Sequence, residues 1–230
     1  MNGTLYGVSV GPGDPELLTL KAARIIRQCP VIAVPRSADE NAPIALGIAL
    51  QAVPEISRKQ IVELSMPMTR DKAELDRTRD KAANRLMELL AAGSDVAFLT
   101  LGDVSVYSTY FYLDERVRAC GYETRVIAGV PSFCAAAARL GVSLTEASQP
   151  LHIIPGSYSS VDEGLGYAGA KVLMKTGKSI EQVKARLKER GLYESARMVQ
   201  KCGMEGERVF DSLDGADADA SYFSIIVVKG

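Results

Sequence analysis

Short apolar segments alternate with longer helical patterns through the first half of the chain, and this alternation restricts the fold more than any other feature. Each apolar segment ends in a loop rich in Gly, Pro or Asp, which is typical of parallel β/α construction. The predicted strands are Leu5–Val10, Val31–Val34, Gln60–Leu64, Asp95–Leu101 and Glu123–Ile127. The predicted helices are Glu16–Gln28, Ala42–Ala52, Lys72–Ala92, Val106–Ala119 and Phe133–Arg139. The first part of the chain is therefore predicted to be an α/β domain.

The strands change character after residues 144–150. Further predicted strands are Leu151–Ile154, Lys171–Lys175, Arg197–Lys201 and Phe223–Val228, with one clear helix at Ile180–Arg190. The tract Ser157–Gly169 lacks apolar periodicity and indicates a loop or a weak helix. At 230 residues the chain has room for one or two domains. We therefore expect two α/β domains, residues 1–145 and residues 150–230, joined by a short linker.

The composition is that of an ordinary globular protein, with 47% hydrophobic residues and a net charge of -1. Without a basic surplus, general binding of nucleic acid is not expected. One histidine and no closely spaced cysteine pair argue against a structural zinc site. Cys120 and Cys134 have apolar or small neighbours and are predicted to be buried thiols. The sequence has neither a run of ~18 apolar residues nor the basic start of a signal peptide, so we expect a cytoplasmic protein with no membrane partner.

The first motif, Gly11–Pro15, follows a strand and precedes a helix, which is the context of a dinucleotide-binding loop. Its composition opposes that function. Glu16 replaces the third glycine, and Pro12 and Pro15 lack the backbone N–H groups that a pyrophosphate requires. Asp14 adds negative charge where phosphates would bind. The sequence instead predicts a rigid turn, with Asp14 as N-cap and Pro15 in the first helical position, and it leaves room for a cationic or neutral ligand.

A second loop, Thr176–Ser179, is similar to the end of a Walker A loop. That motif requires a glycine five residues before Gly177, where this chain has Val172 inside a predicted strand. Without that glycine the loop is unable to wrap around phosphates, so the sequence does not predict an ATP site here.

Two further strand-to-helix junctions fall at Leu99–Thr109 and Ile127–Ala138. Both follow the carboxyl ends of predicted parallel strands, where ligands of such sheets bind. In the first junction, Gly102 permits close approach of the backbone to a ligand. Asp103 is placed either to accept hydrogen bonds from ribose hydroxyls or to cap the following helix. In the second, the small residues from Cys134 onward let a helix pack closely against a sheet or a ligand.

Four segments taken in order, VSVGPGDPELLTL, LTLGDVSVYSTY, VIAGVPSFCAAAARLGVSLT and VLMKTGK, resemble motifs of the tetrapyrrole methylase family. Together they span nearly the whole chain. The resemblance implies two α/β domains with S-adenosylmethionine bound in a cleft between them, S-adenosylhomocysteine as the product, a small-molecule tetrapyrrole substrate and a homodimer. Any cobalt would belong to the substrate, because the chain has no evident set of metal ligands.

Within the family, PMTRDKAEL, VAFLTLGDVSVYSTYFYL, IAGVPSFCAAAARLGVSL and the ending YFSIIVVK look like the branch that methylates C20 of precorrin-2 or its cobalt form, on the route to cobalamin. Two positions depart from the family pattern. Val104 replaces the proline of Gly-Asp-Pro, and Ala128 replaces the proline before Gly129. Open alternatives are a methylase acting at C11 or C17, a diphthine synthase-type methylase, and a non-catalytic tetrapyrrole carrier.

The resemblance also implies a set of cofactor contacts, carried over position by position: Pro12, Leu101, Gly102, Asp103, Val106, Pro131, Ser132, Thr176 and Tyr222. Catalytic roles are expected for Asp103, Tyr107 and Tyr110. The two tyrosines and Tyr112 are candidates for lining the substrate trough or removing the C20 proton, with ordinary packing or surface positions as the alternative.

The many carboxylates of a tetrapyrrole predict arginines in the trough. Arg36, Arg70 and Arg125 lie near predicted strand ends or loops, although a solvated surface position is the common alternative. His152, on an apolar strand, is predicted to be a packed side chain, with contact to substrate or metal as the alternative.

Overall fold

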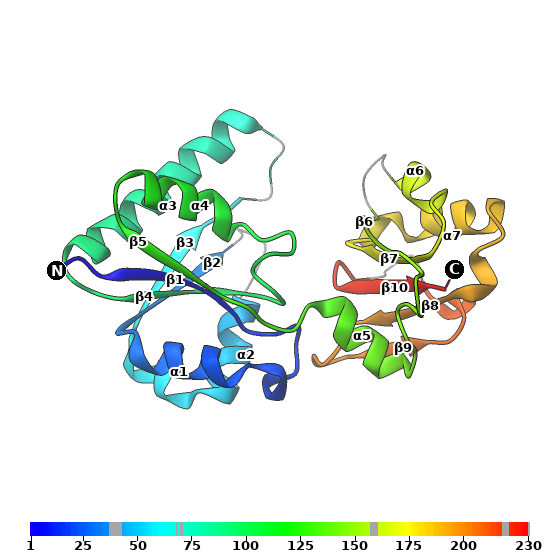
Figure 1. Ribbon diagram of the computed structural model, residues 1–230, viewed down its shortest axis with the longest axis horizontal. Coiled ribbons are helices and arrows are strands. Elements are labelled where there is room, and N and C mark those ends of the chain that lie inside the picture. Colours follow the sequence, from blue (N-terminus) through cyan, green and yellow to red (C-terminus); the bar gives the residue numbers. More distant parts are fainter. Residues whose placement is uncertain (37–42, 68, 70, 157–160, 218–220, 230) are drawn as a thin grey trace. The chain divides into compact units, whose positions relative to one another are not determined.

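The computed structural model describes residues 1–36, 43–67, 69, 71–156, 161–217 and 221–229. The chain divides into two compact units, Met1–Pro131 and Ser132–Gly230, each built on its own five-stranded sheet (Figure 1). Both sheets are combined with helices, so the predicted α/β class is confirmed.

The first unit has a parallel sheet in the order β3-β2-β4-β1-β5. Its strands are β1 Thr4–Ser9, β2 Val31–Arg36, β3 Gln60–Ser65, β4 Val96–Thr100 and β5 Glu123–Ile127. Every neighbouring pair is parallel, so all the carboxyl ends lie at one edge. The central strands β1 and β4 are buried on both faces, which explains their continuous apolar sequences.

Helices cover both faces of this sheet (Figure 1). One face carries α1 (Leu20–Gln28) and α2 (Ile44–Ala52), and the other carries α3 (Lys72–Ala91) and α4 (Tyr110–Ala119). Short 3-10 helices occupy Pro15–Leu17 and Pro54–Arg58. The main core of the unit lies under α3 and α4, where Leu86, Leu113 and Phe98 pack together.

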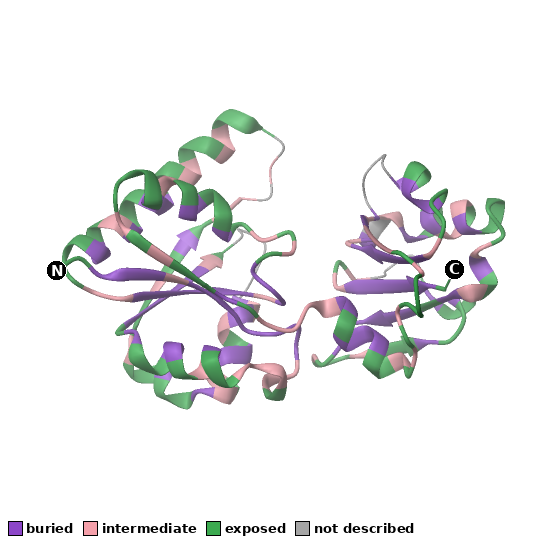
Figure 2. Ribbon diagram, viewed as in Figure 1, coloured by how far each residue is buried: buried purple, intermediate pink, exposed green. Residues whose placement is uncertain are grey.

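The second unit has a mixed sheet in the order β6-β7-β10-β8-β9. Its strands are β6 Leu151–Pro155, β7 Ala170–Met174, β8 Ala196–Gln200, β9 Arg208–Phe210 and β10 Ser224–Val228. Only β6 and β7 pair in parallel, and the other pairs are antiparallel. Its helices are α5 Ser132–Leu140, α6 Val161–Leu165 and α7 Ile180–Glu189, with 3-10 turns at Gly177–Ser179, Tyr193–Ser195 and Leu213–Gly215. Figure 2 shows the buried residues concentrated along the central strands of both sheets.

The division between the units falls earlier than residues 145–150, where the sequence indicated a linker. Helix α5 belongs to the second unit, because its buried face (Ala135, Ala136 and Ala137) packs with strands β8 and β10. Helix α4 begins at Tyr110 instead of Val106, because the preceding residues form an ordered loop. Strand β9 was not predicted, whereas the short helix α6 lies within the tract Ser157–Gly169 for which a weak helix was one alternative.

The prediction that Cys120 and Cys134 are buried was wrong. Both are exposed, whereas Cys29 and Cys202 are buried. Cys120 ends α4, and Cys134 lies on the outward face of α5 between the buried residues Phe133 and Ala135. In the part of the chain that the structure describes, no helix combines the length and the apolar character needed to cross a membrane.

Candidate functional site

Strands β1 and β4 are neighbours at the centre of the first sheet, but the chain leaves them in opposite directions. After β1 it crosses to β2 through α1, and after β4 it crosses to β5 through α4, on the opposite face. Such a reversal opens a crevice at the carboxyl edge of the sheet, where open α/β sheets bind their ligands. The loops that follow β1 and β4 are therefore the candidate ligand-binding loops of the first unit.

Two glycines join these loops. The Gly11 amide donates to the Gly102 carbonyl oxygen at 3.2 Å, and the Gly102 amide donates to the Gly11 carbonyl oxygen at 2.8 Å. Their φ angles are 79° and 73°, a conformation that glycine adopts without strain. The pair fixes the spacing of the two loops before any ligand binds.

Asp103 lies beside this glycine pair and is only 8% exposed. Its Oδ1 accepts hydrogen bonds from the Ser105 amide at 2.8 Å and from the Ser105 hydroxyl. Its Oδ2 accepts from the Gly129 amide at 2.7 Å and, at a longer 3.5 Å, from the Ser9 hydroxyl. Because α4 begins only at Tyr110, Asp103 organises a loop and does not cap the helix.

These donors also set the charge of Asp103. Burial alone would raise the pKa of its carboxyl group, but hydrogen bonds from Ser105, Gly129 and Ser9 outweigh burial and lower the pKa below the ordinary value of 3.8. Asp103 is therefore ionised at neutral pH and is a weak proton acceptor. The geometry does not support the catalytic role expected for it.

Gly129, after β5, brings a third loop into the cluster. A Cβ atom at this position would lie 2.3 Å from the Cβ of Ser9 and 3.1 Å from the carbonyl oxygen of Gly102. Only glycine fits here, whether or not proline precedes it. The loop then runs through Pro131 to Ser132, the first residue of α5, and both residues are half-buried.

The predicted turn after β1 is confirmed in its details. The Asp14 side chain accepts from the Glu16 amide at 2.8 Å, and Pro15 is the first residue of a 3-10 helix. Helix α1 starts separately, with Thr19 as its N-cap. Pro12, predicted to touch the cofactor, is buried within this turn.

In the second unit, Thr176 follows strand β7 and is fully buried. A Cβ added at Gly156 would lie 2.6 Å from its methyl group, and one added at Gly177 would lie 3.5 Å from the Cα of Tyr222. The predicted contacts Thr176 and Tyr222 therefore lie at one edge of the second sheet. Tyr222 is 49% exposed, and its ring lies edge-on to that of Phe223, with 5.3 Å between the centroids.

The Thr176 hydroxyl and the Thr100 hydroxyl share an unusual property. Among the residues that the structure describes, they are the buried side-chain polar groups with no hydrogen-bond partner. A buried polar group left without a partner costs about 1–3 kcal/mol. Thr100 ends strand β4 in register with Ser9, so both side chains lie on the same face of the first sheet. A bound ligand with polar groups would satisfy such hydroxyls.

Sequence reasoning missed Ser9, Thr100 and the role of Gly129. One signal was available: each of two apolar strands ends in a small hydroxyl residue, although burial of a strand end does not by itself call for a polar side chain. Leu101 and Val106, both predicted contacts, are half-buried on either side of the Asp103 turn, and the Val106 amide donates to the Asp103 carbonyl oxygen at 3.1 Å.

The candidate tyrosines separate into one core residue and two surface residues. Tyr110 is fully buried, and its hydroxyl donates to Asp114 at 3.2 Å. Its ring fills the space left by Gly7, where an added Cβ would lie 2.5 Å away. Tyr110 is therefore packed in the core of the first unit, as the alternative to a catalytic role predicted, and that role stays an untested prediction. Tyr107 is 46% exposed with φ 51°, and Tyr112 is 44% exposed, with the Arg79 guanidinium over its ring at 3.6 Å.

The candidate arginines and the histidine lie elsewhere. Arg36 pairs with Glu63, Arg125 pairs with Glu123 at 2.7 Å, and both pairs are exposed. Arg70 lies outside the described residues. His152 Nε2 lies 2.9 Å from the Ala168 carbonyl oxygen, and the ring packs on Tyr167, as expected of a packed histidine.

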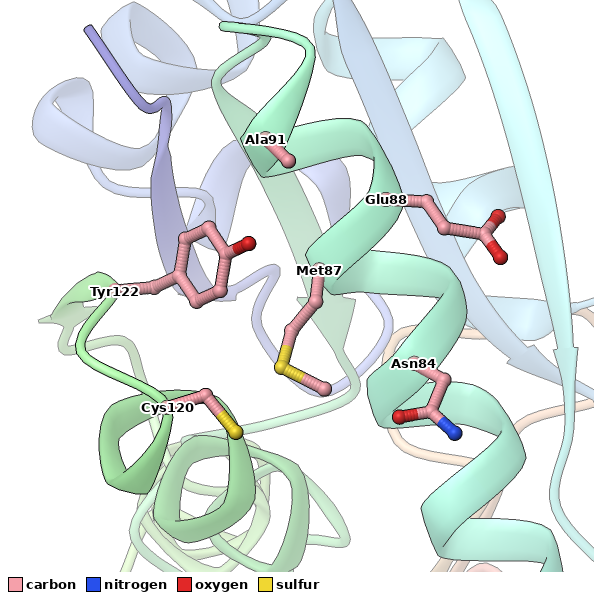
Figure 3. Close-up of a pocket in the computed structure, with 6 residues that line it drawn as sticks. All are labelled: Asn84, Met87, Glu88, Ala91, Cys120 and Tyr122. Atoms are coloured by element: carbon pink, nitrogen blue, oxygen red, sulfur yellow. The ribbon is translucent and has the colours of Figure 1, made fainter.

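An open groove lies between the last turns of α3 and the end of α4 (Figure 3). It is lined by Asn84, Met87, Glu88, Ala91, Cys120 and Tyr122. Tyr122 immediately precedes β5, so the groove lies at the amino edge of the first sheet, away from the Asp103 turn. Across the described ranges, no three His, Cys, Asp or Glu side chains gather into a potential metal site.

Comparison with known proteins gives matches along most of the chain. The family model of Tetrapyrrole (Corrin/Porphyrin) Methylases matches residues 4–216. The cobalamin biosynthesis protein CobIJ of Mycobacterium tuberculosis is 34% identical over 239 residues, which cover 99% of this chain and 46% of the relative. The chain thus spans about half the length of that relative.

Two further matches cover both partners almost fully. The cobalt-precorrin-2 C(20)-methyltransferase of Salmonella typhimurium is 32% identical over 233 residues, 100% of this chain and 97% of the relative. The solved structure of the uroporphyrin-III C-methyltransferase of Thermus thermophilus, complexed with S-adenosyl homocysteine, has a TM-score of 0.73 at 20% identity and covers 99% of this chain and 92% of that chain. The structural likeness shows a shared fold.

Proposed function

The chain belongs to the tetrapyrrole methylase family, and on that premise we propose that it is an S-adenosylmethionine-dependent methyltransferase that methylates C20 of precorrin-2 or its cobalt form in cobalamin biosynthesis. The observation that carries the proposal is the similarity to the Salmonella C20-methyltransferase, which extends over 100% of this chain and 97% of that protein. The Thermus relative bound to S-adenosyl homocysteine supports the choice of cofactor.

The residues present fit such a cofactor. Gly129 and the pair Gly11 and Gly102 leave the loop backbones without side chains at the first edge, and Thr176 offers a buried hydroxyl that lacks a partner among the described residues. The sulfonium of S-adenosylmethionine is positively charged and is therefore compatible with Asp14 and Glu16. The negative charge of these two residues was the argument against a phosphate ligand.

Bound S-adenosylmethionine would supply an activated methyl group: as C20 bonds the methyl carbon, the S–CH₃ bond would break with its electron pair left on sulfur, and the C20 proton would pass to a general base or to solvent. The chain's own residues hold the reacting atoms in line and exclude water, which is where catalysis of such a displacement comes from. No covalent enzyme intermediate is required, so a chain with a single histidine is sufficient for this chemistry.

The proposed cofactor contacts come from each unit. In the first unit they are the turn and loop residues Pro12, Leu101, Gly102, Val106 and Pro131. In the second they are Ser132, Thr176 and Tyr222, the exposed ring of Tyr222 being suited to stacking on an adenine. Tyr107, which is 46% exposed, is the proposed tyrosine of the substrate trough. The role of Asp103 is developed below.

The proposal includes a homodimer in the cytoplasm, which the family resemblance supports. Light scattering on the eluate of a size-exclusion column would test the assembly: twice the 24.7 kDa mass of the chain is expected. A monomer at micromolar concentration would contradict it.

The activity is tested by incubating the protein with precorrin-2 or its cobalt form and ¹³C-methyl S-adenosylmethionine. One added methyl group by mass, placed at C20 by NMR, is the expected product. Addition at another carbon would assign the chain to another branch of the family. Binding of labelled S-adenosylmethionine without turnover of either form would indicate an acceptor of different structure, and no binding at all would indicate a carrier.

A further inference from the structure

The Asp103 carboxylate is bonded mainly by protein donors, and little of its acceptor capacity remains for a ligand. An ionised carboxylate has about four lone-pair positions. The Ser105 amide and hydroxyl occupy those of Oδ1, and the Gly129 amide occupies one of Oδ2. The Ser9 hydroxyl faces the remaining position of Oδ2 at a long 3.5 Å. The residue is also only 8% exposed. A direct hydrogen bond from a cofactor hydroxyl would have to displace the Ser9 hydroxyl and reach a carboxylate that is nearly covered.

The donors come from three separate strand ends. Ser9 is the last residue of β1, Ser105 follows β4, and Gly129 follows β5. Ser9 also closes the cluster, because its oxygen accepts a hydrogen bond from the Val104 amide at 2.9 Å while its hydroxyl faces Asp103. Val104 is where this chain departs from the family's proline, and its amide is a donor that a proline would lack.

We propose that Asp103 is a positioning residue: its carboxylate is the common acceptor that holds the loops after β1, β4 and β5 in the arrangement that receives the cofactor, and it does not itself bind the cofactor. The identity of the ligand rests on the proposed function. The positioning role itself rests on the hydrogen bonds within the first unit. Ser9 contributes to the same arrangement, because its oxygen accepts a hydrogen bond from the Val104 amide.

Two variants separate positioning from direct binding. Asp103→Asn keeps the shape but removes the charge and turns an NH₂ group toward the surrounding donors. Ser9→Ala leaves the carboxylate intact and removes the hydroxyl that both Asp103 and Val104 contact. Ser57→Ala, an exposed serine of the same unit whose hydroxyl donates to the Pro54 carbonyl oxygen, is the matched control.

Calorimetric titration of the full chain with S-adenosylmethionine is the first measurement. Asp103→Asn is expected to weaken affinity about tenfold, the scale of a lost charge-assisted hydrogen bond, and Ser9→Ala to weaken it in the same direction by about threefold to tenfold. The double variant should be no weaker than Asp103→Asn alone, because both changes release the same loops. Ser57→Ala should equal the wild type. If Ser9→Ala binds as the wild type does while Asp103→Asn loses affinity, Asp103 touches the ligand and the proposal fails.

Amide exchange in the ligand-free protein is the second measurement, and it does not depend on the proposed function. The Gly129 and Ser105 amides should exchange at least about tenfold faster in Asp103→Asn, whereas amides of the buried strand β4 keep wild-type rates. Unchanged exchange at Gly129 and Ser105 would overturn the positioning role. A wild-type protein that fails to bind S-adenosylmethionine but shows these exchange changes would refute the proposed function and leave the positioning role standing.

Discussion

The candidate edges of the two units differ in how many hydrogen bonds to buried polar groups are already in place. At the first edge, Asp103 has hydrogen-bond donors from Ser105, Gly129 and Ser9 already in place. At the second, the fully buried Thr176 hydroxyl has no partner among the residues described. The first edge thus has a carboxylate network in place without a ligand, although its Thr100 hydroxyl, like that of Thr176, has no partner in the described part of the chain. No comparable network surrounds Thr176 among the residues described. We infer that the first edge provides a fixed shape and the second gains stability from binding.

Removing Asp103 should break the organised edge most severely. Asp103→Ala leaves several buried donors without an acceptor, and the free energy of unfolding should fall by about 3 kcal/mol, measured by urea denaturation. Asp80→Ala is the control, because Asp80 pairs with Arg116 at an exposed position and should cost less than about 1 kcal/mol. Equal effects of the two substitutions would show that the Asp103 cluster is not what holds the edge.

Gly129→Ala tests the same edge by crowding. The added Cβ would meet Ser9 at 2.3 Å, so the two loops must separate, with an expected loss of about 2 kcal/mol of stability and weaker S-adenosylmethionine binding. Gly47→Ala, inside α2 with nothing within 4 Å, is the control and should stabilise the protein by about 0.5–1 kcal/mol. A Gly129→Ala protein as stable as the wild type would mean that the loops tolerate a wider spacing.

Thr176→Val should act in the opposite sense at the second edge. Replacing an unpartnered buried hydroxyl with a methyl group should raise the stability of the ligand-free protein by about 1 kcal/mol. Affinity for S-adenosylmethionine should fall at the same time, as followed by thermal unfolding with and without the ligand. A ligand-free Thr176→Val protein that is less stable than the wild type would show that the hydroxyl has a partner in the protein, and the contrast between the edges would disappear.

The smallest expected effect is the change in the stability contribution of Asp103 when the pH is lowered. The pKa of Asp103 is lowered on folding, so its contribution to stability is complete at pH values above its ordinary pKa of 3.8 and is lost as pH falls through the lower folded value. The stability difference between wild type and Asp103→Asn should therefore be constant from neutral pH down to about pH 5 and shrink below pH 4. A difference that declines already near pH 6 would indicate a raised pKa and an incompletely bonded carboxylate.

The strands and helices of the first unit were predictable because buried parallel strands are continuous apolar runs, and β5 was placed at its observed bounds, Glu123–Ile127. Helix α5 was assigned to the wrong unit because the alanines that fix its position pack with strands far along the chain. Strand β9 was missed because it has three residues, two of them exposed, and so carries no apolar pattern.

The loops that form the candidate site were predictable from the sequence, but the hydrogen bonds around Asp103 were not. Gly102 and Asp103 follow a strand and attract attention in the sequence. The partner Ser9 lies 94 residues away from Asp103, and Gly129 lies 26 residues away, so only the sheet order brings them together. The burial of Tyr110 was not predictable, because its ring packs against Gly7 on β1, which is far from Tyr110 along the sequence.

The contrast between the edges is tested most directly by following backbone amides of the wild-type protein by NMR during titration with S-adenosylmethionine. The Gly129 and Ser105 amides are expected to be strongly protected from exchange before any ligand is added and to change little on saturation. The resonances of Thr176 and Gly177 are expected to shift, and their amides to gain protection. Rapid exchange at Gly129 and Ser105 in the free protein, with protection appearing only when the ligand binds, would contradict this expectation.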